Sequence, residues 1–271
     1  MKRVAMIGGG AMGGAIVEGI LTGVPEVDVV IVEANDERAD EWRQRGDVEV
    51  ASLADAVRDA DAVFLAVKPH QITDVFRQAA ESIKRGCAVV SIAAGVPLEL
   101  LESIAPTGAA VVRAMPNTPV RVGRGVVGLC AGAKCSPEQL DQVAALLAPV
   151  STVVTIPESL IDALTATSGS GPAYVFYLAE SMTKGAVELG LDPDTAALLV
   201  SETISGAAEL LAASPGDPAG LRAAVTSKGG TTAAATSVFD QRGLPLIVEA
   251  AMRAASDRGQ EMSREQADAA K

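Results

Sequence analysis

The sequence contains few of the residues that usually form metal centres and nucleophilic sites. Its 271 residues include one histidine, His70, and three cysteines, Cys87, Cys130 and Cys135. The cysteines are odd in number and lack the spacing of a metal site, and a catalytic cysteine would need a histidine partner. We therefore expect buried free thiols in a reducing compartment, a His70 that caps or faces solvent, and no metal ion.

Long apolar runs are also missing. No uninterrupted apolar run reaches the roughly 18 residues that are needed to span a bilayer. Apolar residues nonetheless make up 49% of the chain and charged residues 21%, which is typical of a folded, soluble protein. Glycines and Glu18 break the apolar segment that follows Lys2 and Arg3, so we do not interpret it as a secretory signal. These observations favour a cytoplasmic protein that does not bind membranes.

Positive charge is in deficit. The chain has 22 Lys and Arg residues against 34 Asp and Glu residues, which gives a net charge of −12. This balance repels nucleic acid and anionic surfaces in general, so any anionic ligand must be held by local donors. The length is sufficient for about two domains, each with its own core.

Residues 3–14 contain the most informative motif, a glycine-rich turn between an apolar strand and a helix. The spacing Gly8-x-Gly10-x-x-Gly13 is typical of a dinucleotide-binding turn. Gly8 allows the tight turn, Gly10 lets the backbone approach the phosphates, and Gly13 permits close packing of the helix on the strand. The free N–H groups at the helix start attract negative charge, so no cationic side chain is required.

A carboxylate lies at the expected distance from this turn. The second apolar run, Val27–Val32, ends at Glu33, 20 residues after Gly13, near the position of a carboxylate that grips a ribose diol. A glycine turn alone is weak evidence because such a turn can simply join two elements, and the alternative for Glu33 is a solvated strand end. Together the two features favour dinucleotide binding.

Two further strand ends belong to the same predicted crevice, because the carboxyl ends of strands in a doubly wound sheet face the ligand. The strand 62–67 ends at Lys68 and Pro69, and the strand 88–92 ends at residues 93–95, whose small side chains let a flat ring or a ribose approach. A charge that marks a strand end and ordinary turn chemistry explain these segments equally well.

The loop at residues 113–119 has two interpretations. Strand 110–112 is expected to lead into a loop, 113–119, that two prolines stiffen. Asn117 lies between the prolines and either presents its amide to a ligand or belongs to a rigid connector. The polar segment 36–45 is predicted to be a helix, with Trp42 covering the sheet edge.

The alternation of strands and helices predicts the fold class. From residue 3 to about 155, apolar strands alternate with helical segments, which indicates an α/β fold with a doubly wound parallel sheet. After Pro157 there is no convincing strand, and helices are expected to open at Gly171-Pro172 and Asp192-Pro193. We therefore predict a dinucleotide-binding domain over 1–157 and an all-helical domain over 158–271.

The helical half is too apolar and too rich in small residues to be covered by a lone domain of this size. Segments 207–211 and 250–255 suggest helices that pack closely against a partner. We expect a homodimer or a higher homo-oligomer through this domain, with a compact monomer as the alternative.

One loop of the helical half is a second candidate site. Two glycines and two threonines at residues 229–232 precede an alanine-rich helix and expose N–H groups and hydroxyls together. This arrangement suits a small carboxylate, and a simple helix cap explains it equally well.

Six segments, in order along nearly the whole chain, resemble those of the pyrroline-5-carboxylate reductases. The resemblance implies a Rossmann domain, a helical dimerisation domain and a substrate pocket where the two meet. It also implies reduction of the cyclic imine 1-pyrroline-5-carboxylate to L-proline by NADPH or NADH, the last step of proline synthesis. The segments are residues 7–13, 66–69, 91–95, 113–119, 168–174 and 229–232.

The resemblance also implies roles for individual residues. Residues 229–232 would hold the substrate carboxylate, and the Thr232 hydroxyl would reach the ring nitrogen as the candidate catalytic group. Hydride attack on C=N is helped when the nitrogen carries a proton, so a strong acid or a metal is not obligatory and the main task is placement. The candidate substrate-binding residues are Gly229, Gly230, Thr231 and Thr232. The candidate cofactor-binding residues are Ile7, Gly8, Gly9, Gly10, Ala11, Met12, Gly13, Glu33, Asn35, Ala66, Val67, Lys68, Pro69, Ala93, Ala94, Gly95 and Asn117.

The chain departs from the family at two positions. Lys228 stands where many relatives have proline, and it either faces solvent or adds positive charge near the substrate. Glu33 stands where the family often binds the 2′-phosphate of NADPH with Ser, Thr, Asn or Arg. A carboxylate there repels phosphate and favours NADH, but Asn35 and Arg38 follow closely and leave NADPH open.

The alternatives to this reductase are a related enzyme and a binding protein. A related imine or 2-hydroxyacid reductase would normally need a lysine base in the helical domain, where Lys184 is the only candidate at mid-helix. A non-catalytic nucleotide-binding or sensor protein would bind the cofactor without turnover.

Overall fold

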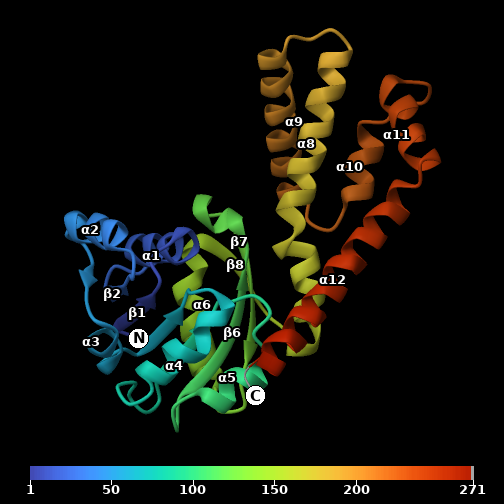
Figure 1. The fold of residues 1–271 in the computed structure, drawn as a ribbon. Helices are drawn as coiled ribbons and strands as arrows, with labels where there is room; N and C mark the ends of the chain where they lie inside the picture. The colour runs from blue at the N-terminus through green and yellow to red at the C-terminus, as the bar shows by residue number, and fades with distance from the viewer. Residues whose placement is uncertain (270–271) are drawn as a thin grey trace. The chain divides into compact units, whose positions relative to one another are not determined.

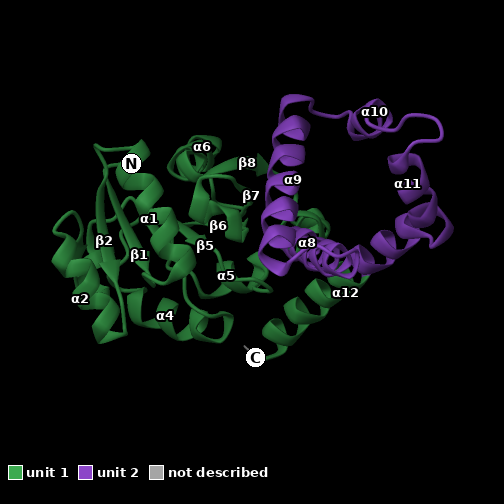
Figure 2. Cartoon of the chain, turned by 90° about the horizontal axis from the view of Figure 1, so that it is seen from above, with its two compact units in different colours: residues 1–170, 254–271 green, residues 171–253 purple. Residues whose placement is uncertain are grey.

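The computed structural model describes residues 1–269. These residues form two compact units (Figure 2). The first unit holds residues 1–170 together with the described end of the chain from Ala254, and the second holds residues 171–253.

The first unit is built on a doubly wound sheet, as the strand alternation predicts (Figure 1). Within the described residues the eight strands have the order β3-β2-β1-β4-β5-β6-β7-β8, and every neighbouring pair is parallel except β6 with β7. The chain runs outward from β1 to β3 and then returns to the other side of β1, so the strand order reverses between β1 and β4. Ligands of such sheets bind at this reversal. The strands are β1 (Arg3–Ile7), β2 (Asp28–Val32), β3 (Glu49–Val50), β4 (Ala62–Leu65), β5 (Ala88–Ser91), β6 (Ala110–Pro116), β7 (Gly125–Ala131) and β8 (Ser151–Thr155).

Both faces of this sheet are covered, which explains why its central strands are apolar throughout. In β1, Val4 and Met6 pack into the core beneath α1, α2 and α6, whereas Ala5 and Ile7 pack into the core beneath α3, α4 and α5. The α-helices of this unit before residue 171 are α1 (Ala11–Gly23), α2 (Asp36–Arg45), α3 (Leu53–Arg58), α4 (Ile72–Ala79), α5 (Leu98–Ile104), α6 (Pro137–Leu147) and α7 (Ile161–Leu164).

Two features of the sheet differ from the sequence-based expectation. Strand β6 continues to Pro116, so residues 113–116 are strand and not loop. Strand β7 is antiparallel to β6 and was not expected, because glycines interrupt its apolar pattern. The structure explains Gly128: a β-carbon there would overlap the side chain of Leu164 in α7.

The second unit is helical throughout its described residues, as expected (Figure 1). Its helices are α8 (Gly171–Glu188), α9 (Pro193–Ala213), α10 (Pro218–Ala224), α11 (Thr231–Gln241) and the first part of α12 (Leu244–Ala269). Helix α9 begins where predicted, and the Asp192 carboxylate accepts a hydrogen bond from the Thr195 N–H (3.0 Å). Helix α9 is also long and apolar enough to cross a membrane by length and composition, although it carries Glu202 and Glu209.

Candidate functional site

The predicted glycine turn follows β1 and is tied to the ends of β2 and β4. The Gly8 N–H donates to the Val32 carbonyl (2.8 Å), and the Ala66 N–H donates to the Ile7 carbonyl (2.8 Å). Gly8 has φ +105°, and a β-carbon there would lie 2.5 Å from the Ala66 carbonyl oxygen. Only glycine fits this position.

The other two glycines of the motif have different roles. A β-carbon on Gly13 would overlap the Gly8 carbonyl oxygen, so this glycine allows the helix to start tightly against the turn. A β-carbon on Gly10 would meet nothing within 4 Å, so this position opens to the space where phosphates would approach. Gly10 caps α1 without a side chain, which leaves the N–H groups of Ala11 and Met12 directed at that space. The turn therefore fits an anionic group.

Glu33 follows β2 and lies beside the turn. Its Oε2 accepts a hydrogen bond from the Gly9 N–H (3.0 Å), and its Oε1 accepts from the Asn35 N–H (2.8 Å) and the Arg38 guanidinium (3.0 Å). The Glu33 side chain is only 5% exposed. Burial alone would raise the pKa of this carboxyl group, but the hydrogen bonds from Arg38, Asn35 and Gly9 outweigh burial and lower the pKa. Glu33 is therefore an anion at neutral pH.

The tryptophan of α2 also contacts the turn. Trp42 Nε1–H donates to the Gly9 carbonyl oxygen (3.1 Å), and the side chain of Arg45 stacks on the indole with its guanidinium carbon 4.8 Å from the ring centre. Trp42 was expected to cover the sheet edge, and its contact with the glycine turn was not predicted from the sequence. No local pattern connects Trp42 with Gly9, 33 residues earlier in the chain.

A pocket of about 460 Å³ lies at this turn. Three arginines line it: Arg38 pairs with Glu33, Arg45 pairs with other carboxylates, and Arg121 has no ion pair within residues 1–269. Arg121, in the short helical turn η2 (Thr118–Val122), was not identified from the sequence. Arg121 is therefore the arginine of this pocket whose charge is available to an anion, which an acidic protein must hold with local cations. The pocket is lined by Gly9, Gly10, Ala11, Gly14, Ala15, Glu18, Arg38, Glu41, Trp42, Arg45 and Arg121.

The remaining cofactor candidates lie at the ends of β4 and β5. Lys68 and His70 are exposed, and the Lys68 N–H donates to the Gln71 side chain (3.0 Å) at a short helical turn that Pro69 begins. The pairing of β4 with β5 extends to the residue that follows β5, because the Ile92 N–H donates to the Leu65 carbonyl (3.2 Å). Residues 66–69 and 93–95 thus follow neighbouring strands at the same carboxyl edge as the glycine turn.

Two asparagines of the candidate set have structural partners. The Asn35 side chain caps α2 by accepting from the Arg38 N–H (2.9 Å). The Asn117 amide is occupied at both ends: Nδ2 donates to the Ser168 carbonyl (2.9 Å), and Oδ1 accepts from the Val126 N–H (2.8 Å). Asn117 is 7% exposed, and this geometry favours the rigid connector over ligand binding.

The second candidate site precedes α11, in the helical unit. Gly229 has φ +74°, and Gly230 caps the helix without a side-chain hydrogen bond. Within the described chain the Thr232 hydroxyl has no hydrogen-bond partner, whereas the Thr236 hydroxyl donates to the Thr232 carbonyl (3.0 Å). Lys228 is exposed. This helix start therefore presents N–H groups and a hydroxyl that are available to a carboxylate.

Two of the three cysteines are buried as the sequence predicted, and the third is not. Cys87 and Cys130 are buried, Cys135 is half-buried, and all are free. Burial raises the pKa of the Cys87 thiol to about 12 and that of the Cys130 thiol to about 11. Within residues 1–269 no group of three or more His, Cys, Asp or Glu side chains is arranged to hold a metal ion.

The fold and the turn together define a class of protein. A doubly wound sheet with a glycine turn at its reversal and a buried carboxylate after β2 is the nucleotide-binding part of an NAD(P)H-dependent oxidoreductase. Comparison with known protein families agrees with this class. Residues 158–262 match the model described as pyrroline-5-carboxylate reductase dimerisation, and residues 3–95 match the model described as NADP oxidoreductase, coenzyme F420-dependent.

Individual relatives identify the family. The pyrroline-5-carboxylate reductases of Mycobacterium tuberculosis strain H37Rv and Pseudomonas aeruginosa are each 40% identical to this chain, over 97% and 96% of it and 97% of each relative. The structure of a pyrroline-5-carboxylate reductase from Coxiella burnetii has a TM-score of 0.91 at 33% identity and covers 96% of this chain and 98% of that chain. The Plasmodium falciparum enzyme with NADP bound has a TM-score of 0.83 at 25% identity, with the same coverage. The chain therefore belongs to the pyrroline-5-carboxylate reductase family.

Proposed function

We propose that this protein is a pyrroline-5-carboxylate reductase. In this proposal a hydride passes from NADPH or NADH to the C=N bond of 1-pyrroline-5-carboxylate and gives L-proline, the last step of proline biosynthesis. The observation that carries the proposal is that α1 and α11 each begin directly after a glycine, with no side-chain hydrogen bond that caps the helix. The start of α1 lies at a glycine turn that is typical of a dinucleotide site, and the start of α11 suits a small carboxylate.

The cofactor is assigned to the first unit. When bound, the reduced nicotinamide supplies the hydride. The turn at residues 8–13 would hold the phosphates, Glu33 would face the ribose, and residues 66–69 and 93–95 would line the remainder of the cofactor. The opening at Gly10 and the adjoining pocket of about 460 Å³ support this assignment.

The substrate is assigned to residues 229–232. The N–H groups at the start of α11 would hold the carboxylate, and the Thr232 hydroxyl would contact the ring nitrogen. In the protonated imine the nitrogen already carries a proton; the hydride forms the new C–H bond while the C=N π electrons become the nitrogen lone pair. The product amine then takes a proton from water. The residues of the site thus bind and orient the imine, and no proton has to come from a strong acid.

We also propose that residues 1–157 act as the nucleotide domain and residues 158–271 as the substrate and dimerisation domain of a cytoplasmic homo-oligomer. Phe176 is 66% exposed and Tyr177 71% exposed in α8, which is unusual for large apolar side chains of a folded chain. A second copy of the chain would cover them. A membrane-spanning α9 is less consistent with Glu202 and Glu209, because carboxylates are costly in lipid.

Steady-state kinetics test the proposal. The purified protein is mixed with 1-pyrroline-5-carboxylate and either NADPH or NADH, and loss of absorbance at the reduced nicotinamide band is followed. Turnover that yields proline is expected. Reduction of 2-keto acids to 2-hydroxyacids without imine reduction would indicate a related reductase, and cofactor binding without any turnover would indicate a sensor. Light scattering on a sizing column then tests the homo-oligomer.

A further inference from the structure

Gly9, the second glycine of the turn, uses both its N–H and its carbonyl oxygen in hydrogen bonds to side chains that come later in the sequence. Its N–H donates to Glu33 Oε2 (3.0 Å), and its carbonyl oxygen accepts from Trp42 Nε1–H (3.1 Å). Both peptide groups that flank its α-carbon are thereby fixed. A turn that is fixed before the ligand arrives loses less conformational entropy on binding.

The indole also fills the space that two glycines leave open. A β-carbon on Gly9 would lie 2.5 Å from Trp42 Nε1, and one on Gly14 would lie 3.2 Å from Trp42 Cζ2. Trp42 is only 8% exposed, yet it lines the pocket at the turn. The side chain is therefore matched in shape to the turn and also borders the space assigned to the nucleotide.

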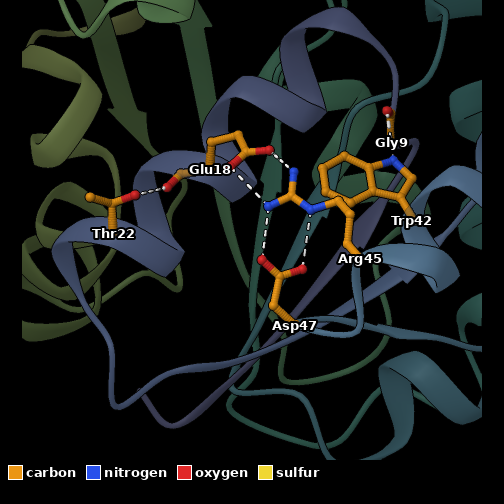
Figure 3. Close-up of polar contacts among 6 residues, drawn as sticks. All are labelled: Gly9, Glu18, Thr22, Trp42, Arg45 and Asp47. Carbon is orange, nitrogen blue, oxygen red and sulfur yellow. Dashed lines mark hydrogen bonds and ion pairs between the residues drawn. The ribbon is translucent and has the colours of Figure 1, made fainter.

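An ionic brace holds the indole in place (Figure 3). The Arg45 guanidinium stacks on Trp42 and bonds to Glu18 of α1 on one side and to Asp47 on the other, where Nη2 lies 2.8 Å from Oδ2. The hydrogen bond that Arg45 donates to the Glu18 carboxylate is the main reason that the pKa of Arg45 is raised. The brace therefore connects α2 to α1 across the pocket.

We infer that Trp42 is a positioning residue for dinucleotide binding: its N–H fixes the Gly9 carbonyl so that the turn is preformed for the cofactor phosphates. The inference rests on the proposed function, because that function names the ligand. Glu33 follows the second strand, the side of the turn where an adenosine ribose binds in such sheets. Trp42 therefore affects cofactor affinity and not the reaction of the imine.

The test compares Trp42→Phe with a matched control, Phe76→Leu. Phenylalanine keeps an aromatic ring but cannot donate a hydrogen bond to Gly9. Phe76 is fully buried in the core on the opposite face of the sheet, so Phe76→Leu reports general destabilisation of the same unit. Binding of NADP⁺ is measured by calorimetry, and KM and kcat are measured for NADPH and for the imine.

Trp42→Phe should weaken NADP⁺ binding about three- to tenfold, the worth of one hydrogen bond. The KM for NADPH should rise to a similar extent, while the KM for the imine and kcat at saturating cofactor stay within about twofold. Phe76→Leu should lower the melting temperature and leave NADP⁺ affinity unchanged. Equal NADP⁺ affinity in Trp42→Phe and the wild type, or an equal loss in Phe76→Leu, would overturn the inference.

The wild-type protein provides a second test that needs no variant. Trp42 is the only tryptophan of the chain, so the intrinsic indole emission reports on this pocket alone. Adding NADP⁺, which does not absorb at the indole emission, should change the emission with the Kd that calorimetry gives. Unchanged emission at calorimetric saturation would overturn the inference even if Trp42→Phe fails to fold. Failure of the proposed function would appear separately, as NADP⁺ binding without imine reduction.

Discussion

Arg113 and Glu158 form an ion pair between strand β6 and the segment that follows β8. Arg113 Nη1 lies 2.8 Å from Glu158 Oε1, and the Arg113 side chain is 6% exposed. The same carboxylate oxygen accepts a hydrogen bond from the Leu98 N–H (2.7 Å), at the start of α5. One carboxylate thus satisfies a buried cation and a helix start.

Removing this carboxylate should destabilise the first unit. We expect Glu158→Ala to lower the free energy of unfolding by about 2 kcal/mol, because a buried guanidinium and a helix N–H lose their partner. Urea unfolding measures the change. The matched control is Glu249→Ala, which removes an exposed pair with Arg253 and should cost less than about 0.5 kcal/mol. Equal effects of the two substitutions would contradict the importance of burial.

Thr232 is expected to act on the imine and not on the cofactor. Thr232→Ala should lower kcat about 10- to 100-fold, because a hydrogen bond to a charged group is lost, while NADPH affinity stays near normal. Thr232→Ser should keep most of the activity. Thr236→Ala is the control, since that hydroxyl donates to a carbonyl of its own helix. Parallel losses of turnover and cofactor affinity in Thr232→Ala would remove Thr232 from the site.

Glu33 is expected to set the preference between the two nicotinamide cofactors. Glu33→Ser removes a buried negative charge and releases Arg38 to pair with the 2′-phosphate, so the ratio of kcat/KM for NADPH over NADH should rise about tenfold. Overall affinity should fall, because the Gly9 N–H loses its acceptor. Adding Arg38→Leu to this variant should abolish the gain. An unchanged ratio in Glu33→Ser would show that the carboxylate does not exclude the phosphate.

Asp61 should make stability fall in acid. Burial opposes its charged form, but hydrogen bonds from Lys84 and from the N–H groups of Lys2 and Arg3 outweigh burial and lower the pKa from 3.8 to about 2. The folded protein thus binds this proton less readily than the unfolded chain. The contribution of Asp61 to the free energy of unfolding is fully present above about pH 4 and is lost as the pH falls toward about 2. The free energies of unfolding of the wild type and of Asp61→Asn should differ above about pH 4 and become equal at low pH. A difference that stays constant across this range would contradict the assignment.

The cysteines should differ in reactivity. The raised pKa values of Cys87 and Cys130 keep both thiols protonated near neutral pH, and both are buried. Cys135 is half-buried, so a thiol reagent should modify it first in the native protein. Mass spectrometry of the peptides identifies the modified cysteine. All three should react in denaturant. Rapid native labelling of Cys87 would show that the first unit opens locally.

Sequence alone determined those features that depend on neighbouring residues. The tight turn at Gly8, the carboxylate of Glu33 after β2 and the start of α9 at Asp192 follow local rules of turn, strand end and helix start, and each lies where the sequence predicted it. The strand and helix alternation likewise determined the doubly wound sheet. Local rules operate over a few residues, which is why a single sequence is sufficient for them.

Tertiary structure alone decided which distant residues meet. Trp42 reaches Gly9, Asn117 is tied to Val126 and Ser168, and Gly128 makes room for Leu164. These contacts arise because the sheet order and the packing of helices bring together segments that no periodicity relates. For this reason the glycine motif could be predicted from the sequence, whereas the side chains that hold it in shape could be identified only from the structure.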